Sequence, residues 1–410
     1  MRRRRPPVRI GVVLLLAGSI LLAAGCGAAP GLGAGSSPST PARTPSTAVP
    51  ASPGATGSPG LACAQESLAT LAEPQLVGQL FAFGLAGSDL TAADSAVLTT
   101  YHLGSVWLVN SRNGGVAGVR ALSDEVQALA TQGDTGGVGF FIGADQEGGL
   151  VQRLTGPGFS TIPTAVAQGR SPVATLREQA AEWGRELAAA GVNLDLAPVA
   201  DVVPPADVGT NQPIGVLDRE YGGDPETVGS HVAAVVEGLG RSGVATTLKH
   251  FPGLGRVAGN TDTVAGVHDD VTTASDPDLA AFGAGIDAGA PLVMVSLAYY
   301  SQIDPGTMAV FSAAIIGNLL RGRLGFAGVV VSDDLGATKA VAAVSPADRA
   351  IDFIEAGGNL VLVQGASVAG QMASAVAARA AADASFGRLV SESALRVLEA
   401  KARLGLLRCG

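Results

Sequence analysis

Short apolar segments alternate with longer amphipathic ones through most of the chain after residue 60. The apolar segments are nearly continuous hydrophobic runs, which is typical of parallel strands covered on both faces. They lie at 79–85, 104–109, 137–143, 192–198, 244–249, 291–297, 328–332 and 359–363. Ala-rich segments with helical periodicity separate most of them, for example 173–190, 225–239, 276–288, 312–324 and 346–356, and a last helix is expected at 391–404.

This alternation predicts an α/β fold, a single (β/α)8 TIM-type barrel with long loops. The alternative is an open doubly wound sheet. No G-x-G-x-x-G follows the first apolar run, which disfavours a dinucleotide-binding version of that sheet. Residues 61–410 are therefore expected to form one barrel domain.

The beginning of the chain has a different pattern. Five Arg and no acidic residue occur in 1–9, and an apolar run follows at 10–24. Such a run is short for a membrane span of about 20 residues and is typical of a secretory signal. The segment Leu22-Ala23-Ala24-Gly25-Cys26 resembles a bacterial lipoprotein signal. We expect 1–25 to be removed and Cys26 to be lipidated, which would anchor an exported protein at the outer face of the cell membrane; an ordinary secreted protein is the alternative.

Residues 26–60 are rich in Pro, Gly, Ser and Thr, and their only charge is Arg43. This composition cannot bury enough apolar area to fold, so a tether is predicted. The remaining cysteines, Cys63 and Cys409, lie at the two ends of the predicted barrel. First and last elements are neighbours in a closed barrel and an exported protein can keep disulfides, so we expect a Cys63–Cys409 bridge; two free thiols are the alternative.

Composition excludes several classes of protein. Hydrophobic residues make up 47% of the 410 residues and charged residues only 15%, which excludes a disordered chain or a coiled coil. The net charge is −9 and only three Lys occur, so a nucleic-acid partner is not expected. Three Cys are too few for a multi-cysteine zinc protein.

Polar clusters follow several of the predicted strands, where catalytic residues of barrels lie. They are 145–153 after the third run, 199–201 and 217–220 after the fourth, 249–255 after the fifth and 332–335 after the seventh. These clusters contain the motifs D-Q-E-G-G, L-A-P-V-x-D-V, D-R-x-x-G-x-D-P, K-H-F-P-G and S-D-D-L. In order and spacing, the five motifs resemble those of glycoside hydrolase family 3, and within it the single-domain β-N-acetylhexosaminidases.

The resemblance implies a retaining mechanism in which Asp333 is the nucleophile that forms a covalent glycosyl-enzyme. It also implies that Asp145, Arg219, Lys249 and His250 hold the terminal sugar; an internal charge network in the barrel mouth is the alternative. Glu147 and Arg153 are expected to be structural partners there. Neighbouring residues of a strand point to opposite faces, so Asp333 and its neighbour should not share a metal, and neither a metal nor a cofactor is expected.

The chain departs from the family at the general acid/base. The family's fifth-strand motif continues as K-H-F-P-G-H-G, and its next loop supplies D-S-H, whose Asp–His pair transfers the proton. Here Leu254 replaces the first of these histidines, Asp262 keeps the acidic residue, and Val264 stands at the second histidine. A valine cannot transfer a proton, so Asp262 or the nearby His268 could serve instead. A third possibility is that nothing replaces the histidine.

These features predict an exo-glycosidase that removes terminal β-linked N-acetylglucosamine from cell-wall-derived glycans. Two alternatives stay open, a glycan-binding lipoprotein with impaired or no catalysis and a β-glucosidase-like hydrolase. The expected partners are a carbohydrate and, through the lipid, a membrane; a monomer is expected.

Overall fold

The computed structural model describes residues 59–409, all within one compact unit, Thr56–Gly410. The expected lipidation site Cys26 and most of the expected tether lie outside the described residues. Among residues 59–409 no helix is both long and apolar enough to cross a membrane.

Eight parallel strands form the centre of this unit, in the order β11-β9-β7-β6-β3-β2-β1-β12. The ring is closed between the two end strands by a bridge from Val331 to Leu360. The predicted (β/α)8 barrel is thereby confirmed. The strands are β1 (Phe81–Leu85), β2 (Ser105–Leu108), β3 (Phe141–Ala144), β6 (Leu194–Asp195), β7 (Ala245–Phe251), β9 (Leu292–Val295), β11 (Val329–Ser332) and β12 (Val361–Val363).

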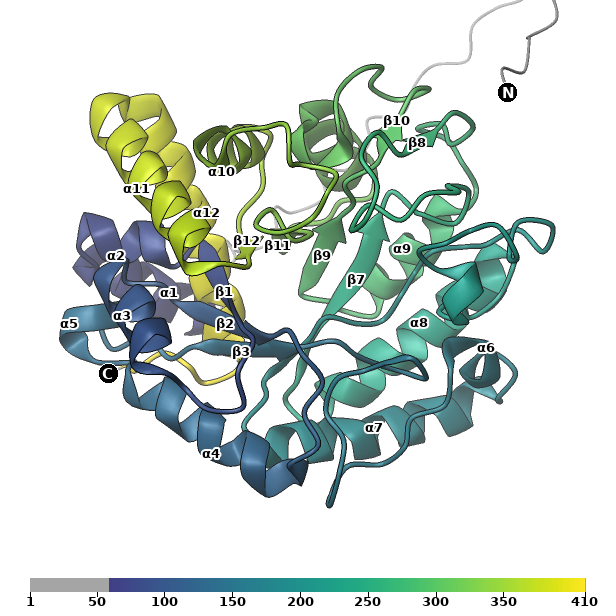
Figure 1. The fold of residues 1–410 in the computed structure, drawn as a ribbon, viewed down its shortest axis with the longest axis horizontal. Helices are drawn as coiled ribbons and strands as arrows, with labels where there is room; N and C mark the ends of the chain where they lie inside the picture. The colour runs from purple at the N-terminus through teal and green to yellow at the C-terminus, as the bar shows by residue number, and fades with distance from the viewer. Residues whose placement is uncertain (1–58, 410) are drawn as a thin grey trace, which may run out of the picture. The chain divides into compact units, whose positions relative to one another are not determined.

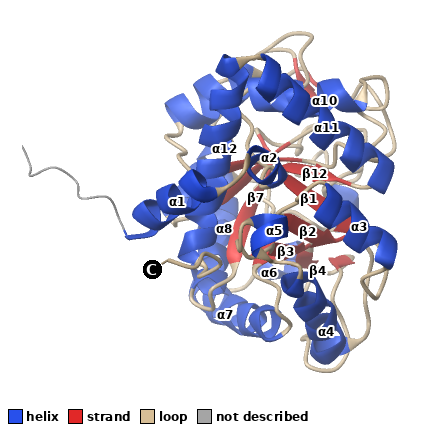
Figure 2. Cartoon of the chain, turned by 90° about the vertical axis from the view of Figure 1, so that its left-hand side faces the viewer, coloured by secondary structure: helices blue, strands red, loops and turns tan. Residues whose placement is uncertain are grey.

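Helices surround the strands, as Figures 1 and 2 show. The longer ones are α1 (Pro59–Thr70), α3 (Ala92–Thr100), α4 (Gly115–Ala128), α7 (Val173–Ala189), α8 (Pro225–Gly240), α9 (Leu279–Asp287), η3 (Ala314–Arg323), α10 (Pro346–Glu355), α11 (Ala366–Ala382) and α12 (Ala384–Arg403). Shorter ones are α2 (Glu73–Gly78), α5 (Gln132–Thr135), α6 (Ala165–Gln168), η1 (Gly215–Leu217) and η2 (Ala309–Phe311). Two small ladders lie in the loops, β4 (Gln146–Gly148) with β5 (Val151–Gln152) and β8 (His268–Asp269) with β10 (Tyr299–Tyr300).

The strands are shorter than the apolar runs that predicted them. The run 192–198 yields only the two residues of β6, and Val199 beyond them forms an isolated bridge with Lys249. The segment 312–324 is helical as expected but is wound as a π-helix over Ala314–Arg323. The last helix begins at Ala384, earlier than the predicted 391.

The barrel interior and the helical layer have separate apolar cores. Phe141, Leu194, Leu292, Val329 and Leu360 belong to the interior cluster. A larger cluster packs the outer faces of the strands against the helices. Since both faces of the strands are buried, the continuous apolar runs of the sequence are explained.

The two ends of the barrel domain lie side by side. Helices α1 and α12 contact each other, and the purple and yellow segments adjoin in Figure 1. Cys63 in α1 and Cys409 after α12 form a disulfide whose Cα atoms are 5.5 Å apart.

Candidate active site

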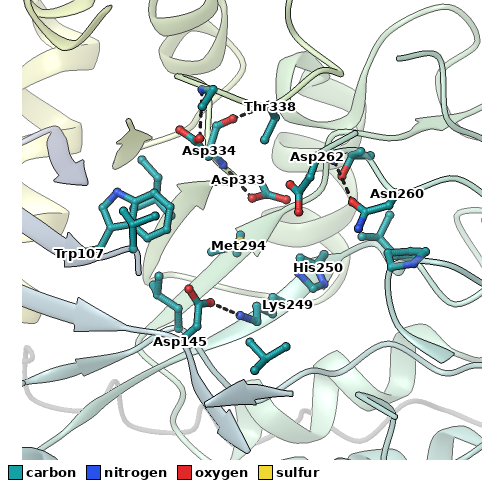
Figure 3. Close-up of a pocket in the computed structure, with 18 of the residues that line it drawn as sticks. Trp107, Asp145, Lys249, His250, Asn260, Asp262, Met294, Asp333, Asp334 and Thr338 are labelled. Atoms are coloured by element: carbon teal, nitrogen blue, oxygen red, sulfur yellow. Dashed lines mark hydrogen bonds and ion pairs between the residues drawn. The ribbon is translucent and has the colours of Figure 1, made fainter. Parts of the chain in front are cut away.

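A pocket of about 380 Å³ opens at the carboxyl ends of the barrel strands. Its walls come from residues far apart in the sequence, because parallel strands of a barrel all end at the same rim. Residues of this lining that Figure 3 labels are Trp107, Asp145, Lys249, His250, Asn260, Asp262, Met294, Asp333, Asp334 and Thr338. Arg219, which the sequence analysis also selected, borders the same pocket.

Lys249 is the centre of a buried charge network on one wall. Its Nζ atom lies 2.6 Å from Oδ1 of Asp145 and 2.6 Å from Oε1 of Glu147. The side chain of Lys249 is 2% exposed, so burial disfavours its charged form. The charges of Asp145 and Glu147 outweigh that effect and raise the pKa of Lys249. Lys249 is therefore held as a fixed cation.

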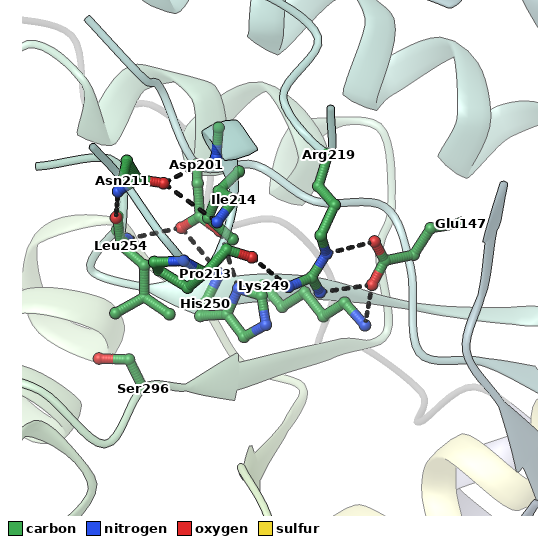
Figure 4. Close-up of polar contacts among 12 residues, drawn as sticks. Glu147, Asp201, Asn211, Pro213, Ile214, Arg219, Lys249, His250, Leu254 and Ser296 are labelled. Atoms are coloured by element: carbon green, nitrogen blue, oxygen red, sulfur yellow. Dashed lines mark hydrogen bonds and ion pairs between the residues drawn. The ribbon is translucent and has the colours of Figure 1, made fainter. Parts of the chain in front are cut away.

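Arg219 completes this network through Glu147 (Figure 4). Its Nε and Nη2 atoms donate to the two carboxylate oxygens of Glu147 at 2.8 and 2.6 Å, and Nη1 donates to the carbonyl of Pro213 at 2.7 Å. Burial opposes ionisation of Glu147, but the neighbouring Arg219 and Lys249 hold its pKa far below the usual value. The internal charge network left open by the sequence thus exists, and Asp145, Lys249 and Arg219 border the pocket as well.

His250 is oriented by a carboxylate beneath it. Its Nδ1 atom lies 2.8 Å from Oδ2 of the wholly buried Asp201, while Oδ1 of Asp201 accepts hydrogen bonds from the backbone N–H groups of His250 and Leu254. A carboxylate accepts, so the proton is assigned to Nδ1 of the imidazole. Nε2 is the ring nitrogen left for a ligand in the pocket.

Asp333 and Asp334 follow β11 and have different environments. The oxygens of Asp334 accept backbone hydrogen bonds from Gly336, Ala337 and Gln364, which fix this carboxylate as the anchor of a turn. Oδ1 of Asp333 accepts one hydrogen bond, from the backbone N–H of Asp334 at 2.8 Å. Asp333 is thus the less engaged carboxylate of the two.

The pKa of Asp333 is raised to about 6. Burial is the largest cause, the negative charge of Asp262 is the next, and His250 acts in the opposite direction. Asp195 at the end of β6, which interacts with Asp145, Glu147 and Lys249, has its pKa raised to about 7, again mainly by burial, but it does not line the pocket. Asp333 is therefore a carboxyl group of the pocket that titrates close to neutrality, which is common at functional sites.

Asp262 lies at the pocket rim, where Figure 3 shows its carboxylate facing that of Asp333. Two loops hold it there. Its backbone N–H donates to Oδ1 of Asn260 at 2.9 Å, and its carbonyl accepts from the N–H of Lys339 in the loop after β11 at 3.1 Å. The side chain itself is exposed, as a group that exchanges protons with a ligand or with water must be.

Asn211 positions the other side of the same loop. Its amide nitrogen donates to the carbonyls of Leu254 at 2.6 Å and Val257 at 2.8 Å, and its oxygen accepts from the N–H groups of Ile214 and Gly215. Asn211 is 1% exposed, so this clamp is buried. The segment that carries Asp262 is therefore tied to the loop that carries Arg219.

His268, the other candidate for proton transfer, is not brought to the pocket. It is exposed in β8, where its ring stacks on that of Tyr299 with centroids 4.8 Å apart. Val264 is 46% exposed, and His250 is the only imidazole among the residues that line the pocket.

The structure adds site residues that the sequence did not indicate. Arg153 was expected to be a structural partner, but it borders the pocket, and its side chain makes no hydrogen bond or ion pair within residues 59–409. Glu147 pairs with Arg219 and Lys249 instead. Trp107 was also missed, because it lies inside an apolar run that reads as ordinary core. Of these two residues, only Arg153 could have been found from the sequence, because it lies shortly after D-Q-E-G-G in the polar cluster that follows the third apolar run.

No group of three or more His, Cys, Asp or Glu side chains within the described part of the chain is arranged to hold a metal ion. The chemistry available in the pocket is that of paired carboxylates beside fixed cations. Asp333 is partly buried with its pKa raised to about 6, Asp262 is exposed at the rim, and glycosidic bond cleavage uses a pair of carboxyl groups.

Comparison with known proteins agrees with this chemistry. The model of the glycosyl hydrolase family 3 N-terminal domain matches residues 70–399. A beta-hexosaminidase of Xanthomonas campestris pv. campestris is 34% identical over 328 residues, which are 76% of this chain and 92% of that protein.

Two solved structures are similar over most of the chain. The β-N-acetylhexosaminidase of Beutenbergia cavernae is 52% identical, with a TM-score of 0.80 over 81% of this chain and 98% of that one. A glycoside hydrolase family 3 β-N-acetylglucosaminidase of Paenibacillus sp. is 30% identical, with a TM-score of 0.73 over 82% of this chain and 63% of that one. Because the family match spans the whole barrel and the pocket at its rim, the chain is a glycoside hydrolase that belongs to glycosyl hydrolase family 3.

Proposed function

We propose that the protein is a retaining exo-glycosidase that removes terminal β-linked N-acetylglucosamine, with Asp333 as the nucleophile. The observation that carries the proposal is the pair formed by Asp333, directly after β11, and Asp262 at the pocket rim. Two carboxyl groups in one pocket are what a retaining glycosidase needs. The choice of sugar follows the relatives that are named for N-acetylhexosamine.

Asp262 is the acid/base in this proposal. In the first step an oxygen of Asp333 bonds to the anomeric carbon, the glycosidic bond breaks, and the proton of Asp262 passes to the leaving oxygen. In the second step water attacks the anomeric carbon, the bond to Asp333 breaks, and the proton of that water returns to Asp262. His268 has no part, since it stacks on Tyr299 outside the pocket lining.

Asp145, Lys249, Arg219 and His250 hold the terminal sugar. Asp145 accepts hydrogen bonds from sugar hydroxyls, whereas Lys249 and Arg219 donate to hydroxyl or N-acetyl oxygens. The network with Glu147 supports this role, because it fixes the cations before the sugar binds and so lowers the entropy that binding must overcome. His250, oriented by Asp201, offers Nε2 to a hydroxyl.

Turnover of aryl β-N-acetylglucosaminides tests the proposal. The wild-type protein should release the aryl group, and Asp333→Ala should not, while His268→Ala should keep the wild-type rate. If the wild type does not exceed Asp333→Ala on any of several aryl sugars, the enzyme proposal fails. Tight glycan binding without turnover would then favour a glycan-binding lipoprotein, and turnover of aryl glucosides alone would favour a β-glucosidase-like hydrolase.

We also propose that the protein is exported and anchored by a lipid on Cys26, where cell-wall-derived glycans are within reach. The support is the order of the Arg-rich start, the apolar run and the Ala-Gly-Cys end of 1–26. Fractionation of cells should find the full chain in the membrane and Cys26→Ser outside it. Equal membrane content of the two proteins would refute the anchor. The protein is proposed to act as a monomer, which light scattering of the released domain tests.

A further inference from the structure

The interior of the barrel is built to accommodate one wide side chain, Trp107 in β2. Its cross-strand neighbours are glycines on both sides, Gly84 in β1 and Gly143 in β3. A Cβ at Gly84 would lie 3.2 Å from Nε1 of Trp107 and under 3 Å from Val109 and Gln364, while one at Gly143 would lie 3.7 Å from the Trp107 Cβ. The missing side chain at Gly84 thus leaves room for the indole against the barrel wall.

The indole belongs to the apolar floor of the pocket. Trp107, Met294 and Leu362 in three strands and Leu196 directly after β6 line the pocket and share the interior apolar cluster. Figure 3 shows Trp107 on the side of the pocket away from His250 and Asp262. Asp145 lies on the same side as the indole, so polar groups surround the space that the indole borders.

Packing alone does not account for a tryptophan at this position. Nε1 of Trp107 is buried and makes no hydrogen bond within the described residues, although buried indole N–H groups usually find a partner. A leucine or phenylalanine would fill the floor without an unpaired donor. What tryptophan adds over these residues is a broad, flat and polarisable surface.

We propose that Trp107 is the platform on which the C–H-rich face of the terminal sugar stacks. A pyranose has hydroxyl groups around its edge and C–H groups on its faces, so a pocket for it needs polar groups at the edge and an apolar surface beneath. Asp145, Lys249 and His250 supply the first, and Trp107 supplies the second. This inference rests on the proposed function, because it takes the terminal sugar as the ligand.

The sequence makes this contact observable, because it contains only Trp107 and Trp183. Trp183 lies in α7 and does not border the pocket, so Trp183→Phe should leave hydrolysis unchanged and make Trp107 the only indole emitter. Addition of N-acetylglucosamine to this variant should change the tryptophan emission, with the same half-saturation as its competitive inhibition of aryl-glycoside hydrolysis. In Trp107→Phe, which retains Trp183, the emission should stay constant.

A second comparison measures how much the aromatic ring at position 107 contributes to binding of the sugar. Trp107→Phe keeps an aromatic face, whereas Trp107→Leu does not. The inhibition constant of N-acetylglucosamine should therefore be about tenfold higher for Trp107→Leu than for Trp107→Phe. Competitive inhibition without any change of Trp107 emission would overturn the stacking proposal and leave the proposed function standing, even if the leucine variant failed to fold. Absence of both hydrolysis and inhibition in the wild type would instead contradict the proposed function and, with it, the platform.

Discussion

The negative charge of Asp262 contributes to the raised pKa of Asp333, which lies at about 6. Asp262→Asn removes that charge, so the pKa of Asp333 should fall and the acid limb of the kcat/KM profile should move to lower pH. An aryl substrate with a good leaving group should be used, because it depends little on the acid. Asp270→Asn, at an exposed carboxylate away from the pocket, should leave the limb in place. An unchanged limb in Asp262→Asn would show that the two carboxylates do not interact.

Asp333 should also reduce the stability of the fold at neutral pH. Its folded-state pKa of about 6 lies above the ordinary 3.8, so the folded protein binds more protons than the unfolded chain between these values. The carboxylate therefore costs stability that is absent below pH 3.8 and complete above pH 6. Asp333→Asn should raise the free energy of unfolding at pH 7 by on the order of 1–3 kcal/mol while abolishing hydrolysis. Chemical denaturation at neutral and acidic pH measures this, and a variant destabilised at neutral pH would refute it.

Lys401 is buried without a carboxylate partner. Its Nζ donates to Oε1 of Gln79 and to the carbonyl of Gly104, both at 2.7 Å, and lies 5.3 Å from the Phe141 ring centroid. Burial lowers its pKa well below 10.5, so between the folded and unfolded values the folded protein binds fewer protons and stability rises with pH. The stability of the wild type relative to Lys401→Met should therefore grow as the pH is raised from neutrality, as urea denaturation at several pH values would show. The exposed Lys339→Met should show no such trend.

The disulfide between Cys63 and Cys409 closes a loop with a sequence separation of 346. Cys63→Ser should lower the free energy of unfolding by about 2–5 kcal/mol, because the unfolded chain regains the freedom that the cross-link removes. A reductant should destabilise the wild type by a similar amount and leave Cys63→Ser unaffected. Thermal unfolding in the four combinations measures this, and identical curves for wild type and variant would contradict a stabilising bridge.

The barrel could be predicted from the sequence because each strand is buried on both faces and reads as a continuous apolar run. The positions of Asp145 and Asp333 could be predicted for a related reason, since a charged residue that follows such a run lies at a strand end. Lys249 lies within β7, two residues before its end. Strand lengths could not be predicted. They depend on where hydrogen-bonded partners exist, and the run 192–198 yields only the two residues of β6.

Ion pairs between residues far apart along the chain also could not be predicted from the sequence. Glu147 is close to Arg153 along the chain but pairs with Arg219, 72 residues away, because both reach the same wall of the barrel. Trp107 could not be separated from core residues, since the direction of a β2 side chain is decided only when the barrel closes. The position of Asp262 depends on backbone hydrogen bonds to Asn260 and Lys339, which no motif encodes.

We propose that Asp262 performs the proton transfer of the family's missing histidine, and hydrolysis of two kinds of substrate by Asp262→Ala is the decisive measurement. Loss of a general acid costs typically about 10²–10⁴-fold, but a good leaving group needs no protonation. Asp262→Ala should therefore hydrolyse a natural disaccharide far more slowly than the wild type, cleave an activated aryl glycoside at a nearly normal first step, and regain turnover with azide by forming the β-glycosyl azide. His268→Ala should behave as the wild type. Equal losses on both substrates with no azide product, or normal hydrolysis of the disaccharide by Asp262→Ala, would contradict the account.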